Sequence, residues 1–164
     1  PNILGIEKTI TAKEAIMNPE KATGKVVVVG GGLVGTETAL MLGQAGKDVT
    51  IIEMRNAIAL EDEPLSQIAL NTELAAANVK ILVNSTVKEI AEGKVIYENE
   101  GTKEIEADTV IAALGLKART NVVEELRLED VETHVIGDAV RGRKLANCTS
   151  EAWLAVKRIN GDYR

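Results

Sequence analysis

The sequence is short of the residues that build thiol redox centres, zinc sites and nucleic-acid surfaces. Its 164 residues include one cysteine, Cys148, which excludes an internal disulfide, a CxxC redox pair and a zinc site made of several cysteines. Phenylalanine is absent, and the aromatic residues are Tyr97, Trp153 and Tyr163. Because the net charge of −6 provides no basic face, the composition argues against a nucleic-acid partner.

Long apolar runs are also absent. No uninterrupted apolar stretch approaches the roughly 20 residues that a membrane-spanning helix needs. Apolar residues make up 45% of the chain and charged residues 27%, which is the balance of a folded globular protein rather than a disordered one. With a single cysteine we expect a reducing compartment, most simply the cytoplasm, and no membrane partner.

What is present is an alternation of strands and helices. Four valines in a row, 26–29, predict a strand that is buried on both faces. A helix is expected over about 33–44, with Gly46 after its end, and a second strand over 49–52. Since strand, helix and strand follow one another closely, the two strands should be parallel and joined by a right-handed crossover.

Other segments have weaker but recognisable patterns. Thr11 followed by Glu14 is a capping box, which predicts a short helix. Alternating segments between residues 86 and 106, separated by glycine-containing turns, predict an antiparallel meander. The remaining expected elements are a helix over 65–77, strands at 79–83, 109–113 and 135–136, and a closing helix over 151–159 capped by Ser150.

The most informative motif lies between the valine strand and the first long helix. Gly30, Gly32 and Gly35 have the GxGxxG spacing, in which the glycines allow a tight turn, close approach of a pyrophosphate and close helix packing. The pyrophosphate would lie on free N–H groups at the positive end of the helix dipole. The candidate cradle is the whole loop, Gly30, Gly31, Gly32, Leu33, Val34 and Gly35. The alternative is a glycine-rich turn that binds nothing.

The end of the second strand bears on the choice of coenzyme. Glu53 follows Gly30 by 23 residues, close to the position of the ribose-binding acid in dinucleotide sites. Its carboxylate would repel the 2′-phosphate of NADPH, whereas Arg55 could receive that phosphate. The sequence therefore favours NADH, with NADPH as the alternative, and Met54 completes this candidate wall of the site.

These motifs give the chain a family resemblance. It resembles the NAD(P)H-binding module of the FAD-dependent pyridine nucleotide–disulfide oxidoreductase superfamily. The ending is most similar to that of NADH:flavin oxidoreductases such as 2,4-dienoyl-CoA reductase and 2-enoate reductase. The segments that carry the resemblance are residues 26–35 with Glu37 and Ala39, then 49–53, 108–115 and 134–139, and finally 143–155.

The resemblance implies an α/β fold. It consists of a Rossmann-like parallel sheet with helices on both faces, a three-stranded antiparallel meander, and a C-terminal strand and helix from a split FAD domain. Residues 1–24 would be a linker from the FAD domain with a short helix, 25–118 the NAD(P)H-binding domain, and 119–164 the returning segment of the FAD domain. The rest of the FAD domain, and a flavin-containing barrel, would belong to the same parent chain.

The resemblance also implies a function. The fragment would position NADH for hydride transfer to FAD held mainly by the rest of the parent chain, and alone it would bind nucleotide without turnover. Hydride transfer needs no acid–base residue and no metal from this chain. The residues that the resemblance places near the nicotinamide are Glu37, Ala113, Leu114 and Gly115, and those that it places near the flavin are Gly137 and Asp138, with the turn at 149–151.

Two other interpretations remain open. A non-catalytic NAD(H)-sensing module would share the fold and the glycine loop, but it would have no reason to carry the segment 136–138 or the closing helix. A methyltransferase that uses S-adenosylmethionine would share the loop and the acid, but not the meander. The acidic run 61–63 is interpreted as charge that suits a helix N-terminus rather than as a metal site. The oligomeric state is left open.

Overall fold

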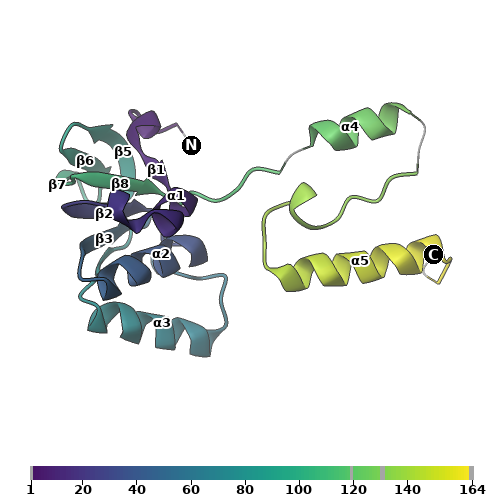
Figure 1. Cartoon of the computed structure of the whole chain (residues 1–164), viewed down its shortest axis with the longest axis horizontal. Helices are drawn as coiled ribbons and strands as arrows, with labels where there is room; N and C mark the ends of the chain where they lie inside the picture. The colour runs from purple at the N-terminus through teal and green to yellow at the C-terminus, as the bar shows by residue number, and fades with distance from the viewer. Residues whose placement is uncertain (1, 119, 130–131, 163–164) are drawn as a thin grey trace. The chain divides into compact units, whose positions relative to one another are not determined.

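The computed structural model describes residues 2–118, 120–129 and 132–162. By its internal contacts the chain divides into two compact units, Pro1–Leu114 and Gly115–Arg164. The first unit contains both sheets and the helices α1 to α3, and the second contains α4 and α5 (Figure 1). Residue 119, where the sequence places the start of the FAD-domain segment, lies outside the described residues, and that assignment stays a prediction.

The centre of the first unit is a five-stranded parallel sheet in the order β1-β8-β2-β3-β4. From β2 the chain proceeds outward through β3 and β4, and it later returns to β8 on the other side of β2. The carboxyl ends of β2 and β8 therefore form a topological switch point, the place where open α/β sheets bind ligands. The strands are β1 (Ile10–Thr11), β2 (Lys25–Val29), β3 (Asp48–Ile52), β4 (Lys80–Leu82) and β8 (Thr109–Ala112).

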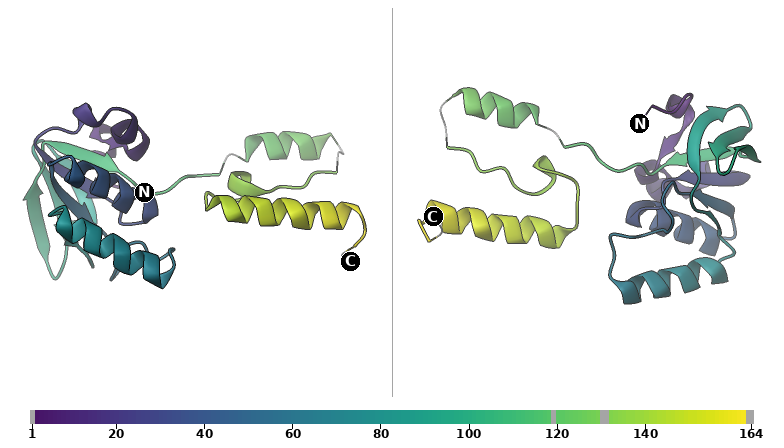
Figure 2. Two further views of the ribbon diagram at one scale, coloured as in Figure 1. Left: turned by 60° about the horizontal axis from the view of Figure 1, so that its bottom comes forward. Right: turned by 180° about the vertical axis from the view of Figure 1, so that it is seen from behind.

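The two faces of this sheet are covered by different structures (Figures 1 and 2). Helices α1 (Ala12–Met17), α2 (Leu33–Gln44) and α3 (Pro64–Ala76) cover one face, where they pack with Val26 and Val28. The antiparallel sheet of β5 (Thr86–Ala91), β6 (Lys94–Glu98) and β7 (Thr102–Glu106) covers the other, against Val27 and Val29. Because successive side chains of a strand point to opposite faces, the valine run serves both cores.

The fold class predicted from the sequence is confirmed, with one correction to how the parallel sheet is covered. Helices were expected on both faces, but in the first unit they lie on one face only. The connections from β2 to β3 and from β3 to β4 each carry a helix, and right-handed crossovers in the same direction place both on the same side. The connection from β4 back to β8 carries the antiparallel sheet instead of a helix.

The N-terminal segment takes part in the sheet. The capping box predicted at the start of α1 is present, since the Thr11 hydroxyl accepts from the Glu14 amide and the Glu14 carboxylate accepts from the Thr11 amide at 2.9 Å. Residues predicted to be only a linker with a short helix also supply β1, which pairs with β8. Two 3₁₀ turns, η1 (Ile6–Lys8) and η2 (Pro19–Lys21), flank this region.

The second unit differs from the prediction in two respects. Helix α5 (Leu145–Ile159) begins before Ser150, which therefore lies inside the helix, and Lys144 is its N-cap. The C-terminal strand expected at 135–136 is not formed, because a strand requires a hydrogen-bonding partner and the described part of this unit supplies none. These residues are extended and lead into a 3₁₀ turn, η3 (Gly137–Ala139).

Helix α4 (Asn121–Leu128) was not predicted. Its signal in the sequence is the spacing of Val122 and Leu126, which lie one helical turn apart. None of the helices in the described part of the chain combines the length and the apolar character that a membrane span requires.

Candidate functional site

The glycine motif that joins β2 to the first turn of α2 contains three glycines that leave no room for a side chain. A Cβ atom at Gly30 would lie 2.6 Å from the carbonyl oxygen of Ala113, and one at Gly35 would lie 2.0 Å from the carbonyl oxygen of Gly30. A Cβ at Gly31 would lie 2.7 Å from the side chain of Ile58. The chain can pack this closely here only because these residues are glycines. Gly30 also has a φ of 106°, a backbone conformation that favours glycine.

Gly32 is different from its neighbours. It is the N-cap of α2 and has φ −70°, a conformation that any residue adopts. A Cβ at Gly32 would meet only one atom within 4 Å, the Oε2 of Glu61 at 4.0 Å. The chain itself thus does not require a glycine at this position. The open space lies at the N-terminus of α2, whose first N–H groups have no acceptor within the helix, so the cradle fits a pyrophosphate.

Glu53, at the end of β3, is buried and holds the glycine loop. Only 5% of its surface is exposed. Its Oε2 accepts a hydrogen bond from the Gly31 amide at 2.6 Å, and its Oε1 accepts from the Arg55 amide at 2.8 Å and from Arg55 Nε at 3.0 Å. Glu53 is therefore a positioning residue for the loop, a role that the sequence did not reveal. Since a carboxylate oxygen can accept two hydrogen bonds, Oε2 retains capacity for a ribose hydroxyl.

The segment that follows β3 forms a second wall beside the glycine loop. The Ala59 amide donates to the carbonyl oxygen of Gly31 at 2.7 Å. Ala59 is buried and has a φ of 49°, which costs a non-glycine residue about 1–2 kcal/mol. Arg55 donates from Nη1 to Glu61 Oε1 at 2.7 Å. This hydrogen bond, followed by the one to Glu53, holds the pKa of the Arg55 guanidinium above its ordinary value.

The first unit brings most of the candidate residues together at the carboxyl edge of the parallel sheet. A Cβ atom at Gly35 would lie 3.1 Å from the side chain of Ala113. A Cβ atom at Gly30 would lie 3.6 Å from the side chain of Leu114. Glu37 is exposed on α2. The candidates that meet at this edge are the loop residues Gly30, Gly31, Gly32, Leu33, Val34 and Gly35 after β2, Glu53, Met54 and Arg55 after β3, and Ala113 and Leu114 after β8.

Ile58, Ala59 and Glu61 are the residues of this site that sequence reasoning missed. The acid was interpreted only as a charge near a helix N-terminus, and the two apolar residues were not singled out. The sequence points to these residues only through their position after the second strand of the unit, since a segment there passes beside the glycine loop. Their roles come from contacts with residues distant in sequence, which no local pattern encodes.

The other candidates, Gly115, Gly137 and Asp138, belong to the second unit. Gly137 has a φ of 62°, and its amide donates to Glu151 Oε2 at 2.7 Å. Glu151 also pairs with Arg143, and Asp138 is exposed.

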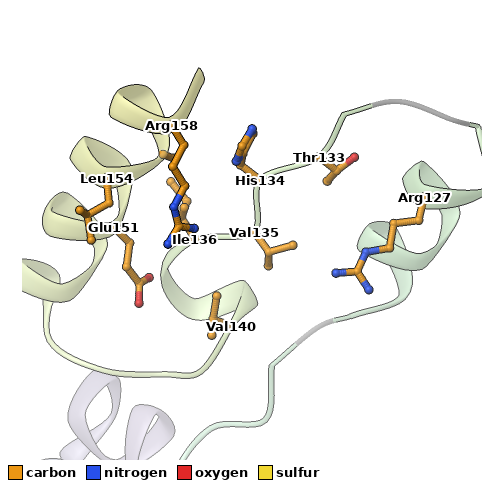
Figure 3. Close-up of a pocket in the computed structure, with 10 residues that line it drawn as sticks. Arg127, Thr133, His134, Val135, Ile136, Val140, Glu151, Leu154 and Arg158 are labelled. Carbon is orange, nitrogen blue, oxygen red and sulfur yellow. The ribbon is translucent and has the colours of Figure 1, made fainter. Parts of the chain in front are cut away.

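A pocket of about 400 Å³ next to this turn is lined by α4, the extended segment 133–136 and α5 (Figure 3). In the described ranges, no three His, Cys, Asp or Glu side chains are grouped to hold a metal ion.

The Glu151 carboxylate gives the turn at Gly137 a pH dependence that can be measured. The Gly137 amide, followed by Arg143, holds the pKa of Glu151 below its ordinary value of 4.5. A carboxyl with a depressed folded-state pKa stabilises the fold above pH 4.5, and this contribution is lost as the pH falls through the lower folded-state pKa. We expect the Gly137 amide resonance to titrate with a midpoint below 4.5 in NMR spectra. The Glu151→Gln variant should lack this titration, and a midpoint at or above 4.5 would contradict the assignment.

Comparison with known proteins identifies the family. Residues 1–139 match the family model described as pyridine nucleotide-disulphide oxidoreductase. The chain belongs to this family. The resemblance recognised in the sequence is thereby confirmed, and the family is one of oxidoreductases.

Curated relatives and solved structures match most of the chain. Cinnamate reductase of Clostridium sporogenes is 34% identical over 163 residues, covering 96% of this chain and 24% of that protein. NADH oxidase of Thermoanaerobacter brockii is 35% identical over 139 residues, covering 82% of this chain and 21% of that protein. Among solved structures, 2-naphthoyl-CoA reductase has a TM-score of 0.83 at 26% identity, over 93% of this chain and 24% of that one. The chain thus spans about a quarter of the length of these relatives.

Proposed function

We propose that this chain is the NAD(P)H-binding domain of a flavoprotein oxidoreductase and that it positions NADH for hydride transfer to FAD. The observation that carries the proposal is the contrast within the glycine loop. Gly30, Gly31 and Gly35 are required by contacts with the chain itself, whereas the space beside Gly32 is open. A glycine that the fold does not need, at the N-terminus of a helix and at the switch point of a parallel sheet, is explained by a ligand that must approach the backbone there.

Each part of the site has a task in this proposal. When bound, the nicotinamide coenzyme supplies the hydride and FAD accepts it. The amides at the start of α2, with the helix dipole, would neutralise the pyrophosphate. Glu53 keeps the loop in shape and would accept from a ribose hydroxyl, while Ala113 and Leu114 would border the nicotinamide half. No side chain of this chain needs to transfer a proton, so its contribution is orientation and electrostatics.

We also propose that the rest of an FAD domain, and a flavin-containing barrel, belong to the same parent chain, and that the parent is cytoplasmic. The length of the relatives supports the presence of these further domains, since the chain spans about a quarter of them. The exposed apolar residues of α5 support it as well, because Trp153, Val156 and Ile159 are each more than half exposed. Such apolar surface is normally covered by another part of a protein. The single cysteine of the chain is what favours the cytoplasm. Alone, the chain should bind nucleotide without turnover.

Parallel calorimetric titrations with NADH, NADPH, FAD and S-adenosylmethionine test the proposal. We expect saturable binding of NADH that is tighter than that of the other three. Tighter binding of S-adenosylmethionine would indicate a methyltransferase, and failure of both this chain and the full-length parent to bind NADH would refute the proposal. If the parent binds NADH but a bound flavin is not reduced under anaerobic conditions, the domain is a sensor of NAD(H) rather than part of an electron-transfer enzyme.

A further inference from the structure

We infer that Glu61 is a positioning residue that sets coenzyme specificity, because it holds the Arg55 guanidinium between two carboxylates and so withholds it from the 2′-phosphate of NADPH. The inference rests on the proposed function and concerns the adenosine end of the same site. It assigns the preference for NADH to a residue outside the glycine motif and outside the strand that carries Glu53.

The contacts of Arg55 carry the inference. Its Nε donates to Glu53 Oε1 at 3.0 Å, and its Nη1 donates to Glu61 Oε1 at 2.7 Å. The Arg55 side chain is 36% exposed, so a ligand can reach it, but its orientation is already set by the two acids. The other oxygen of Glu61 lies 4.0 Å from where a Cβ of Gly32 would be. Glu61 thus borders both Arg55 and the open space of the cradle.

The charges of this group disfavour a second phosphate. Two carboxylates and one guanidinium give a net charge of −1, and a phosphate monoester carries roughly −1.5 to −2 near neutral pH. An arginine with free donors would bind such a phosphate through two parallel hydrogen bonds. Here Nε and Nη1 already donate to the two carboxylates, and the net field repels the 2′-phosphate. NADH has only ribose hydroxyls at that position and does not meet this repulsion.

Glu61 can be altered with less effect on the loop than Glu53. Glu53 is buried and accepts from the Gly31 amide, so its removal would disturb the binding of either coenzyme. The Glu61 side chain is 54% exposed and pairs with Arg55, whereas the Gly31 amide donates to Glu53. Neutralising Glu61 should therefore free the Arg55 Nη1 donors and leave a neutral Glu53–Arg55 pair in place.

The test compares NADPH and NADH affinities of the full chain and its Glu61→Gln variant by calorimetry. We expect NADPH affinity to rise about fivefold to tenfold and NADH affinity by about twofold, since the pyrophosphate also gains from the loss of a nearby negative charge. The gain for NADPH should shrink at high salt. Glu61→Asp, which retains the charge, should restore most of the discrimination.

Two further variants serve as controls. Glu63→Gln makes the same change of charge on the same segment, but in the described part of the chain the ion pairs of Arg55 are with Glu53 and Glu61. It should leave the ratio of NADPH to NADH affinity as it is. Adding Arg55→Gln to Glu61→Gln should cancel the gain for NADPH, because the freed guanidinium is then absent.

The outcomes separate this inference from the proposed function. If NADH binds but Glu61→Gln leaves the ratio unchanged, or Glu63→Gln shifts it equally, the inference is overturned and the proposed function stands. If the unaltered chain, its Glu61→Gln variant and the full-length parent all fail to bind either coenzyme, both are overturned. A ratio that shifts with Glu61→Gln and returns with the double variant supports the inference.

Discussion

Replacing Gly32 by valine is expected to weaken NADH binding by about a hundredfold or more while the fold is retained. The new side chain would occupy the space in which the pyrophosphate has to approach the backbone. Loss of two charge-assisted hydrogen bonds, at about 1.5 kcal/mol each, corresponds to a factor of that size. The fold should tolerate the change because Gly32 has φ −70° and an added Cβ would meet only one atom, at 4.0 Å.

Calorimetry with NADH, together with circular dichroism and a thermal melt, checks this prediction. Gly35→Val is the contrasting variant, since its Cβ would lie 2.0 Å from the carbonyl oxygen of Gly30 and should destabilise the first unit itself. The two substitutions are chemically identical and only three residues apart. If folded Gly32→Val binds NADH as well as the unaltered chain does, the glycine loop is not the nucleotide site.

Replacing Glu53 by alanine is expected to lower the free energy of unfolding of the first unit by about 2–4 kcal/mol. The substitution removes the carboxylate that accepts hydrogen bonds from the Gly31 amide, the Arg55 amide and Arg55 Nε. A buried donor that loses its acceptor costs about 1–3 kcal/mol, and hydrogen bonds to charged groups are at the upper end. NADH affinity should fall as well, because the loop no longer has a fixed shape.

Urea unfolding followed by far-UV circular dichroism measures this effect. Glu92→Ala is a suitable control because Glu92 is exposed in the turn between β5 and β6, where a surface substitution changes stability by about 0.5 kcal/mol or less. Equal stability of the Glu53 and Glu92 variants would show that the hydrogen bonds of Glu53 contribute no net stability. A Glu53→Arg substitution would not test coenzyme preference alone. Because Glu53 is buried, the new arginine would place a second cation beside Arg55 and would therefore also lower the stability of the first unit.

Several elements could be predicted from the sequence because their causes are local. The valine run has no polar alternation, which indicates a strand buried on both faces, and the structure leaves Val26 to Val29 at most 3% exposed. The box of Thr11 and Glu14 satisfies the first amides of α1 within three residues. The meander was recognisable because its strands alternate and are joined by short turns.

The strand expected at 135–136 and the coverage of the parallel sheet were mispredicted because distant parts of the chain decide them. Residues 135–136 have the composition of a strand, but a strand also needs a neighbour, and none is supplied by the described residues of the second unit. Ser150 is a good N-cap residue, yet α5 starts at Leu145, because a favourable cap does not end a helix that can continue through it. The helices lie on one face of the parallel sheet because the antiparallel sheet occupies the other.

The sequence by itself determined the family, the strand–loop–helix unit and the acid that follows the next strand, since these depend on glycine spacing and on short-range hydrophobic periodicity. Only the tertiary structure decided which glycine has open space beside it, that Glu53 accepts a hydrogen bond from the loop, and that Glu61 pairs with Arg55. These properties depend on pairs of residues brought together by sheet register and packing, as Gly30 and Ala113 are at the ends of adjacent strands. Local patterns carry no record of such pairs.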